Sequence, residues 1–148
     1  MTNLRGETLP DALKGTAFAA LLALGLGASA SLVPAETHAE PRTIPVIAGQ
    51  NAGYDACGTV GQVAGLDPNG DGFLAVRAGP QSDYDLLDKL QNGEYVYVCD
   101  QSGKWYGVVY GPPGRDCGVT HPWPQAAAYK GPCFSGWVFG KYIREAAG

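Results

Sequence analysis

The stretch Glu94–Tyr110, EYVYVCDQSGKWYGVVY, contains two runs of β-forming residues separated by a turn signal. In the first run, Glu94 to Cys99, valines alternate with tyrosines, so the two residue types would lie on opposite faces of a strand. The second run, Trp105 to Tyr110, is rich in aromatic and β-branched residues, which favour strands. Ser102-Gly103 supplies the turn between them. The stretch therefore predicts two consecutive strands.

Short apolar runs and turn signals alternate through the rest of the chain from residue 58 onward. Further strands are expected at Gly58–Val63, Phe73–Arg77 and Ser135–Phe139. Turn signals lie at Asp67–Gly72, Gly79-Pro80 and Gln91–Gly93. Short helices are expected at most at Lys141–Ala147 and Tyr84–Leu90. Five strands without a long amphipathic helix predict an all-β fold, a small closed barrel without exposed sheet edges.

Composition limits the classes of protein to be considered. The 148 residues suffice for one domain, and an aromatic content of 10% with a net charge of -4 excludes wholesale disorder. The acidic balance also argues against nucleic acid as a partner, because no basic stripe is present to neutralise phosphates.

The first 39 residues have the features of a secretory signal peptide. Thr16 to Gly27 is uncharged and rich in Ala and Leu, and it is short for a bilayer span, which needs about 20 apolar residues. Cleavage is expected after Ala39, with Ala30 as a second site and an uncleaved N-terminal anchor as the alternative. Residues 40–56 would then form a linker or N-terminal extension of a periplasmic or secreted protein without a stable membrane span.

Four cysteines follow the expected cleavage site, namely Cys57, Cys99, Cys117 and Cys133. An even number in a small exported domain predicts two disulfides. Of the three pairings, Cys117–Cys133 with Cys57–Cys99 is favoured, because Cys117 and Cys133 flank a proline-rich loop that their bond would close. A zinc site is disfavoured because the chain contains no C-x-x-C pair.

The loop Asp67–Gly72 (DPNGDG) matches the first half of a calcium-binding loop. A complete loop starting at Asp67 would need a carboxylate at residue 78, where the chain has alanine, so a polar turn is the favoured alternative. No paired catalytic carboxylates, phosphate-binding glycine loop or G-x-S-x-G elbow is present in the sequence. The chain is therefore expected to be no enzyme and to need no cofactor.

Several segments together resemble a bacterial Src-homology-3 (SH3) domain. They are Phe73–Pro80 (FLAVRAGP) followed by Tyr84, Leu90–Glu94 (LQNGE), Gly103–Tyr106 (GKWY), Gly136–Val138 (GWV) and Lys141–Ile143 (KYI). The resemblance covers Phe73 to Ile143 in the order typical of that family. Residues 57–148 would form this SH3-like domain. Residues 111–133 depart from the pattern as an insertion in place of a tight turn.

The resemblance implies binding to a cell-wall peptide or glycan, or to an envelope protein. By motif position, Trp105, Tyr142 and Tyr84 would lie on the ligand surface, whereas Trp137 is expected to pack inside. Aromatic faces suit this role because they bury large areas at little entropic cost. The insertion adds Trp123 and Tyr129, which would either bind a ligand or cover the barrel. The alternative function is that of a partner-protein subunit or enzyme inhibitor that binds through the insertion; the ligand and the oligomeric state stay open.

Overall fold

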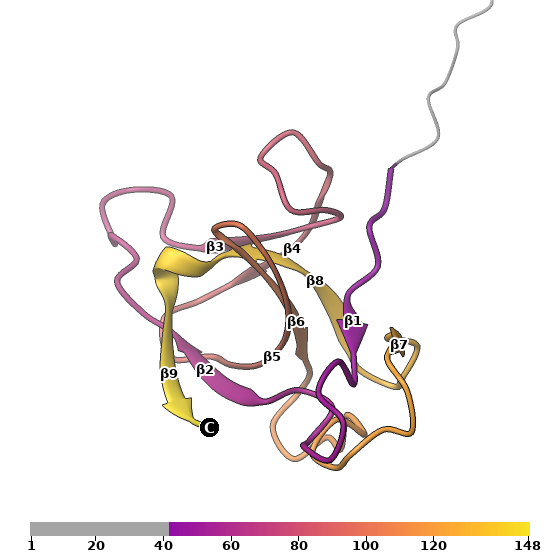
Figure 1. Cartoon of the computed structure of the whole chain (residues 1–148). Coiled ribbons are helices and arrows are strands. Elements are labelled where there is room, and N and C mark those ends of the chain that lie inside the picture. Colours follow the sequence, from indigo (N-terminus) through magenta and orange to yellow (C-terminus); the bar gives the residue numbers. More distant parts are fainter. Residues whose placement is uncertain (1–41) are drawn as a thin grey trace, which may run out of the picture. The chain divides into compact units, whose positions relative to one another are not determined.

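The computed structural model describes residues 42–148, and the expected signal peptide with both cleavage sites lies outside them. The described chain is built from nine strands and one 3-10 turn (Figure 1). In chain order these are β1 (Ile47–Ala48), β2 (Thr59–Val63), β3 (Leu74–Arg77), β4 (Leu86–Leu90), β5 (Tyr95–Ser102), β6 (Trp105–Tyr110), β7 (Ala127–Ala128), β8 (Phe134–Phe139), η1 (Gly140–Tyr142) and β9 (Ile143–Ala147). The all-β prediction is confirmed. No helix within this part of the chain is long and apolar enough to cross a membrane.

Seven strands form one antiparallel sheet in the order β4-β3-β8-β6-β5-β2-β9. This sheet curls strongly (Figure 1), but its ends do not pair, so the expected closed barrel is wrong. The unpaired edges belong to β4 and β9. Both edge strands carry charged side chains, Asp88 and Lys89 on β4 and Arg144 and Glu145 on β9. Charged side chains on an exposed edge strand discourage pairing with strands of other chains. A closed barrel needs no such protection because it has no exposed edge.

The five strands expected from the sequence are all present, as β2, β3, β5, β6 and β8. The two stretches considered for short helices are mainly strand: Leu86–Leu90 forms β4, and Ile143–Ala147 forms β9 directly after the 3-10 turn Gly140–Tyr142. Segments of five residues are too short to be stable as isolated helices. Backbone pairing with a neighbouring strand, β3 for β4 and β2 for β9, therefore decides their conformation.

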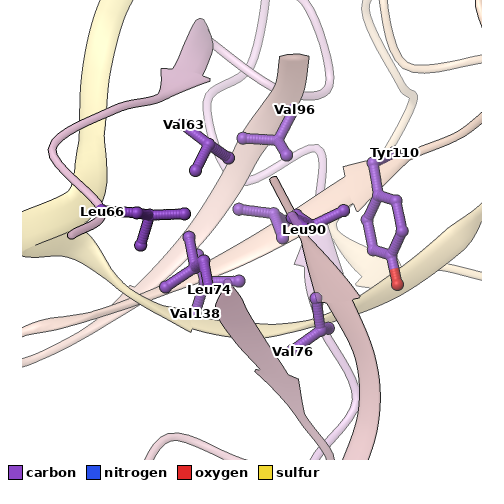
Figure 2. Packing of buried hydrophobic residues seen from close by; sticks show 9 residues of the cluster. Val63, Leu66, Leu74, Val76, Leu90, Val96, Tyr110 and Val138 are labelled. Atoms are coloured by element: carbon purple, nitrogen blue, oxygen red, sulfur yellow. The ribbon is translucent and has the colours of Figure 1, made fainter. Parts of the chain in front are cut away.

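The concave side of the sheet encloses the main hydrophobic core. It consists mainly of valines and leucines from alternate positions of the strands and from the segment after β2 (Figure 2). Its buried members are Val63, Leu66, Leu74, Val76, Leu90, Val96, Val108, Tyr110 and Val138. These side chains alternate along each strand with outward-facing residues, as the period-2 geometry of a strand requires.

A second core lies on the outer side of β6, where Val109 is fully buried. It is covered by the N-terminal segment and by residues 111–133, which pair with each other through β1 and β7. We call this cluster the outer core; its buried members are Ala48, Ala56, Cys57, Val109, Cys117, Val119 and Tyr129. Both faces of β6 are thus removed from water from Gly107 to Tyr110.

The N-terminal segment 42–56 is packed onto the sheet, so of the two alternatives, linker or N-terminal extension, these residues form an extension. Val46 and Ala48 are buried, and the Tyr129 backbone N–H donates to the Val46 carbonyl over 2.9 Å. The indole Nε1 of Trp137 donates to the Ile44 carbonyl over 2.7 Å, and the Ile47 N–H donates to the Asp100 carboxylate over 2.9 Å. Trp137 is therefore a packing residue, as expected. The N-terminal segment is an integral part of the fold, although its sequence shows little hydrophobic periodicity.

Both disulfides have the favoured pairing, Cys57–Cys99 and Cys117–Cys133. The first joins the segment before β2 to β5. The second closes the 111–133 segment at the base of the outer core. All four cysteines belong to this cluster or pack against it, and Cys57–Cys99 is the bond that links the outer layer directly to a strand of the sheet.

Replacing either cysteine pair by serine should lower the free energy of unfolding. The closed loops span 42 and 16 residues, for which chain entropy predicts losses of about 4 and about 3 kcal/mol. Urea unfolding followed by circular dichroism measures both. Unchanged stability in both double variants would show that the outer core holds without covalent links.

Tyr110→Phe tests a polar contact at the end of the main core. The Tyr110 hydroxyl donates to the Asp88 carboxylate over 3.0 Å, and burial, followed by this bond and the charge of Asp88, raises the pKa of the phenol well above its usual value of 10.0. The variant should lose about 1 kcal/mol of stability at pH 7. Because the unfolded phenol ionises first, this contribution should disappear as the pH rises above 10. Urea unfolding at several pH values measures the difference in stability between wild type and variant. An unchanged difference in strong alkali would contradict the prediction.

Candidate ligand-binding groove

A groove of about 630 Å³ opens between the loop 66–72, β3 and the ends of β6 and β8. Four aromatic side chains line it, from Phe73, Trp105, Phe139 and Tyr142. All four are half-buried, so each is held by packing and still exposes ring surface. Pockets of this kind, mostly apolar with a few polar groups, are typical ligand sites.

Three of these rings form a continuous row along the groove. Trp105 packs edge-on against Phe139 with ring centroids 5.7 Å apart, and Phe139 packs edge-on against Tyr142 at 6.3 Å. Trp105 and Phe139 are directly opposite each other in the β6–β8 ladder, and η1 turns the chain so that Tyr142 follows. Backbone pairing therefore fixes Trp105 and Phe139, and η1 positions Tyr142 beside them.

The groove lies where β3 and β8 separate. Within the described chain these strands pair at one position, Arg77↔Trp137. Continuing that antiparallel register would place Ala75 opposite Phe139, but both of these residues line the groove instead. On β3 beyond this pair, Leu74 and Val76 are buried and Ala75 is half-buried.

The polar lining of the groove comes from Asp67, Asp71, Arg77 and Ser82. Asp67 forms the turn expected of this loop: its carboxylate accepts from the Asn69 N–H over 2.8 Å, and its carbonyl accepts from the Gly70 N–H over 3.1 Å. The described residues contain no cluster of three or more His, Cys, Asp or Glu side chains suited to a metal ion.

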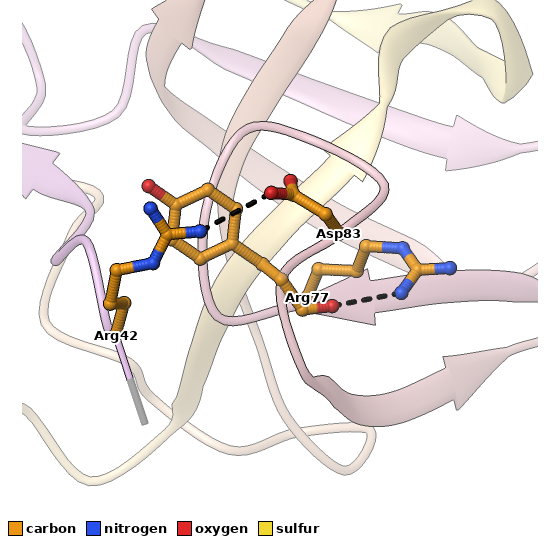
Figure 3. A network of polar contacts seen from close by, with 4 residues as sticks. Arg42, Arg77 and Asp83 are labelled. Carbon is orange, nitrogen blue, oxygen red and sulfur yellow. Dashed lines mark hydrogen bonds and ion pairs between the residues drawn. The ribbon is translucent and has the colours of Figure 1, made fainter. Parts of the chain in front are cut away.

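Of the five aromatic residues predicted to bind ligand, the structure brings Trp105 and Tyr142 together. Tyr84 lies outside the groove lining, packed over Gly79, where an added Cβ would collide with its ring. The Arg42 guanidinium lies 4.8 Å from the centre of that ring and pairs with Asp83 over 3.2 Å, while Arg77 donates to the Tyr84 carbonyl (Figure 3). Tyr84 thus anchors the N-terminal segment to the loop that follows β3.

Trp123 and Tyr129, the aromatic residues of the 111–133 segment, point into the outer core. Their rings stack with centroids 6.5 Å apart and an interplanar angle of 9°. The Tyr129 hydroxyl donates to the Cys117 carbonyl and accepts from the Cys133 N–H, and the Trp123 indole donates to the Gly118 carbonyl. The Tyr129 hydroxyl and the Trp123 indole N–H are therefore both hydrogen-bonded within the segment. Of the two alternatives, ligand binding or covering the barrel, these two side chains cover the sheet.

The sequence reasoning missed Phe73 and Phe139 as lining residues. Phe73 was visible at the start of a predicted strand, directly after the acidic loop. Phe139 enters the groove because it is opposite Trp105 in the ladder. That register could not be inferred, since 23 residues from 111 to 133 separate the two strands in the chain.

Comparisons of the chain with protein-family models, with curated proteins and with solved structures give no match.

Proposed function

We propose that this protein is an exported, non-enzymatic binding module that attaches to peptidoglycan through the aromatic groove. The observation that carries the proposal is the row Trp105–Phe139–Tyr142, held by β6, β8 and η1 and half-exposed in the groove. Rigid aromatic rings bind with little loss of conformational entropy, because they are ordered before the ligand arrives.

Two further observations support this assignment. Strands β3, β5, β6 and β8 overlap or adjoin segments that resemble a bacterial SH3 domain, and Trp137 is buried. The two disulfides fit an oxidising compartment, since cytosolic proteins rarely keep such bonds. Export to the periplasm or beyond would bring the groove into contact with the cell wall.

The alternative function, binding a partner protein through residues 111–133, has less support. The two large aromatic side chains of this segment, Trp123 and Tyr129, pack in the outer core, and their polar atoms are hydrogen-bonded within the segment. Interfaces are usually dominated by a few aromatic or arginine side chains that fill pockets of the partner. The aromatic candidates for that role are in the groove rather than in this segment.

Trp105→Ala should weaken retention of the protein on isolated peptidoglycan sacculi. Because a central aromatic contact typically contributes about 2 kcal/mol or more to binding, the affinity should fall at least tenfold. Co-sedimentation at increasing concentrations of sacculi measures the loss. Tyr54→Ala is the matched control, since Tyr54 is 73% exposed and lies outside the groove lining.

Circular dichroism and urea unfolding would first establish that both variants are folded. Equal retention of wild type, Trp105→Ala and Tyr54→Ala would remove the groove from the binding surface. Absence of retention for all three proteins would refute attachment to the wall.

A further inference from the structure

A second pocket, of about 260 Å³, lies at the other end of β6 from the groove. Tyr110, the last residue of β6, lines this pocket, whereas Trp105, the first residue of the strand, lines the groove. The two pockets share no lining residue. The second pocket is smaller than the usual site for a drug-sized ligand, so it suits a single ring. We call it the tyrosine pocket.

Two further tyrosines, both from β5, line the tyrosine pocket. Tyr95 and Tyr97 are two residues apart on the strand, so their side chains point to the same side of the sheet. Tyr97 is half-buried against the outer core, and Tyr95 is 60% exposed. The hydroxyl of Tyr110 donates to the Asp88 carboxylate. The tyrosine hydroxyls that can bond a ligand in the pocket are therefore those of β5.

A proline-rich turn at the start of the 111–133 segment forms the rest of the wall, with Pro112, Pro113 and Arg115 in the lining. The Arg115 backbone N–H donates to the Pro112 carbonyl over 3.0 Å and closes the turn. Cys117, two residues further on, is fixed by its disulfide. Because prolines restrict the backbone as well, the turn is ordered before a ligand arrives, which lowers the entropic cost of binding.

Arg115 is the lining residue with a charged side chain. The ion pair found among residues 42–148 joins Arg42 to Asp83, so the Arg115 guanidinium has no such partner within this part of the chain. Three carboxylates belong to residues that adjoin or contact the lining, and each already accepts a hydrogen bond. They are Asp88, from the Tyr110 hydroxyl, Glu94, from the Gln91 N–H, and Asp116, from the Gly118 N–H. The guanidinium is left for an anionic group of a ligand.

The surroundings of the tyrosine pocket favour a ring over an extended peptide. The strands that contribute to it, β2, β5 and β6, are interior strands of the sheet, so a peptide has no edge strand to join there. Tyrosine rings offer flat faces for stacking and hydroxyls for hydrogen bonds, which match the faces and hydroxyls of a sugar. Arginine binds a carboxylate through two parallel N–H···O bonds.

We propose that the tyrosine pocket binds a uronic acid residue of an acidic polysaccharide. The sugar ring lies against Tyr95 and Tyr97 and bonds to their hydroxyls, and its carboxylate pairs with Arg115. The site is separate from the aromatic groove, so one molecule of the protein holds two ligands at opposite ends of β6.

The experiment compares three small probes by NMR titration of the full chain at low salt. They are methyl glucuronide, methyl glucoside, which lacks the carboxylate, and benzoate, which lacks the sugar hydroxyls. The wild type should bind the glucuronide about fivefold more tightly than either other probe. The preference over the glucoside should shrink at high salt, because the Arg115 side chain is exposed and its charge is screened.

Two variants assign the contacts. Arg115→Gln should lower the affinity for the glucuronide to that for the glucoside and leave the latter unchanged. Tyr95→Ala should weaken both sugars at least fivefold. Arg144→Gln is the matched control, an exposed arginine on β9 outside the lining, and it should bind like the wild type. Trp105→Ala should also bind the glucuronide normally, since Trp105 belongs to the groove. Circular dichroism would establish that each variant is folded.

Equal affinity of the wild type for the two sugars, absence of binding, or an unchanged preference in Arg115→Gln would overturn the proposal. Tighter binding of benzoate would overturn it too, because an aromatic acid would then be the preferred ligand. Loss of glucuronide binding in Trp105→Ala would move the sugar to the groove and end the assignment of this pocket. Retention on sacculi depends on Trp105 and glucuronide binding on Arg115, so the proposed function and this inference can fail separately.

Discussion

The structure depends on covering both faces of β6 within a domain of about one hundred residues. Val108 belongs to the main core and Val109 to the outer core, so adjacent residues of one strand are buried in opposite directions. A seven-stranded sheet alone would leave Val109 and its neighbours exposed to water, which is costly for apolar surface. The N-terminal segment and residues 111–133 remove that surface together; the Cys57–Cys99 bond joins the chain before β2 to β5, and the Cys117–Cys133 bond closes the 111–133 segment. Small exported domains often require such covalent links because their cores are small.

The groove remains open because the outer core is covered by other aromatic residues than those that line the groove. The outer layer uses Trp123 and Tyr129 for packing, whereas Trp105, Phe139 and Tyr142 lie at the far ends of β6 and β8, where β3 separates from the sheet. The groove lies at the end of the sheet where the ladder between β3 and β8 is interrupted. Pairing of β6 with β8 holds Trp105 and Phe139 in place there.

Local patterns were sufficient to predict the five central strands, because alternation and β-branching act within a few residues. They failed for β4, β9 and the N-terminal segment, whose conformations depend on partners distant in sequence. The disulfide pairing was inferred correctly because one pair brackets a loop without strand pattern. Trp105 and Tyr142 were found through the order of the family-like segments, whereas Phe139 required a register across the 111–133 segment. Tyr84 lies outside the groove lining, with its ring held by Arg42 of the N-terminal segment.

The three tryptophans occupy three different environments, which gives the protein intrinsic optical reporters. Trp137 is 3% exposed and its indole is bound to a carbonyl, Trp123 is stacked on a tyrosine, and Trp105 stands half-exposed in the groove. A soluble quencher should therefore reach Trp105 far more easily than Trp137. Emission from the native protein should shift toward the blue when Trp105 is shielded from solvent, so occupancy of the groove becomes visible without attaching a dye.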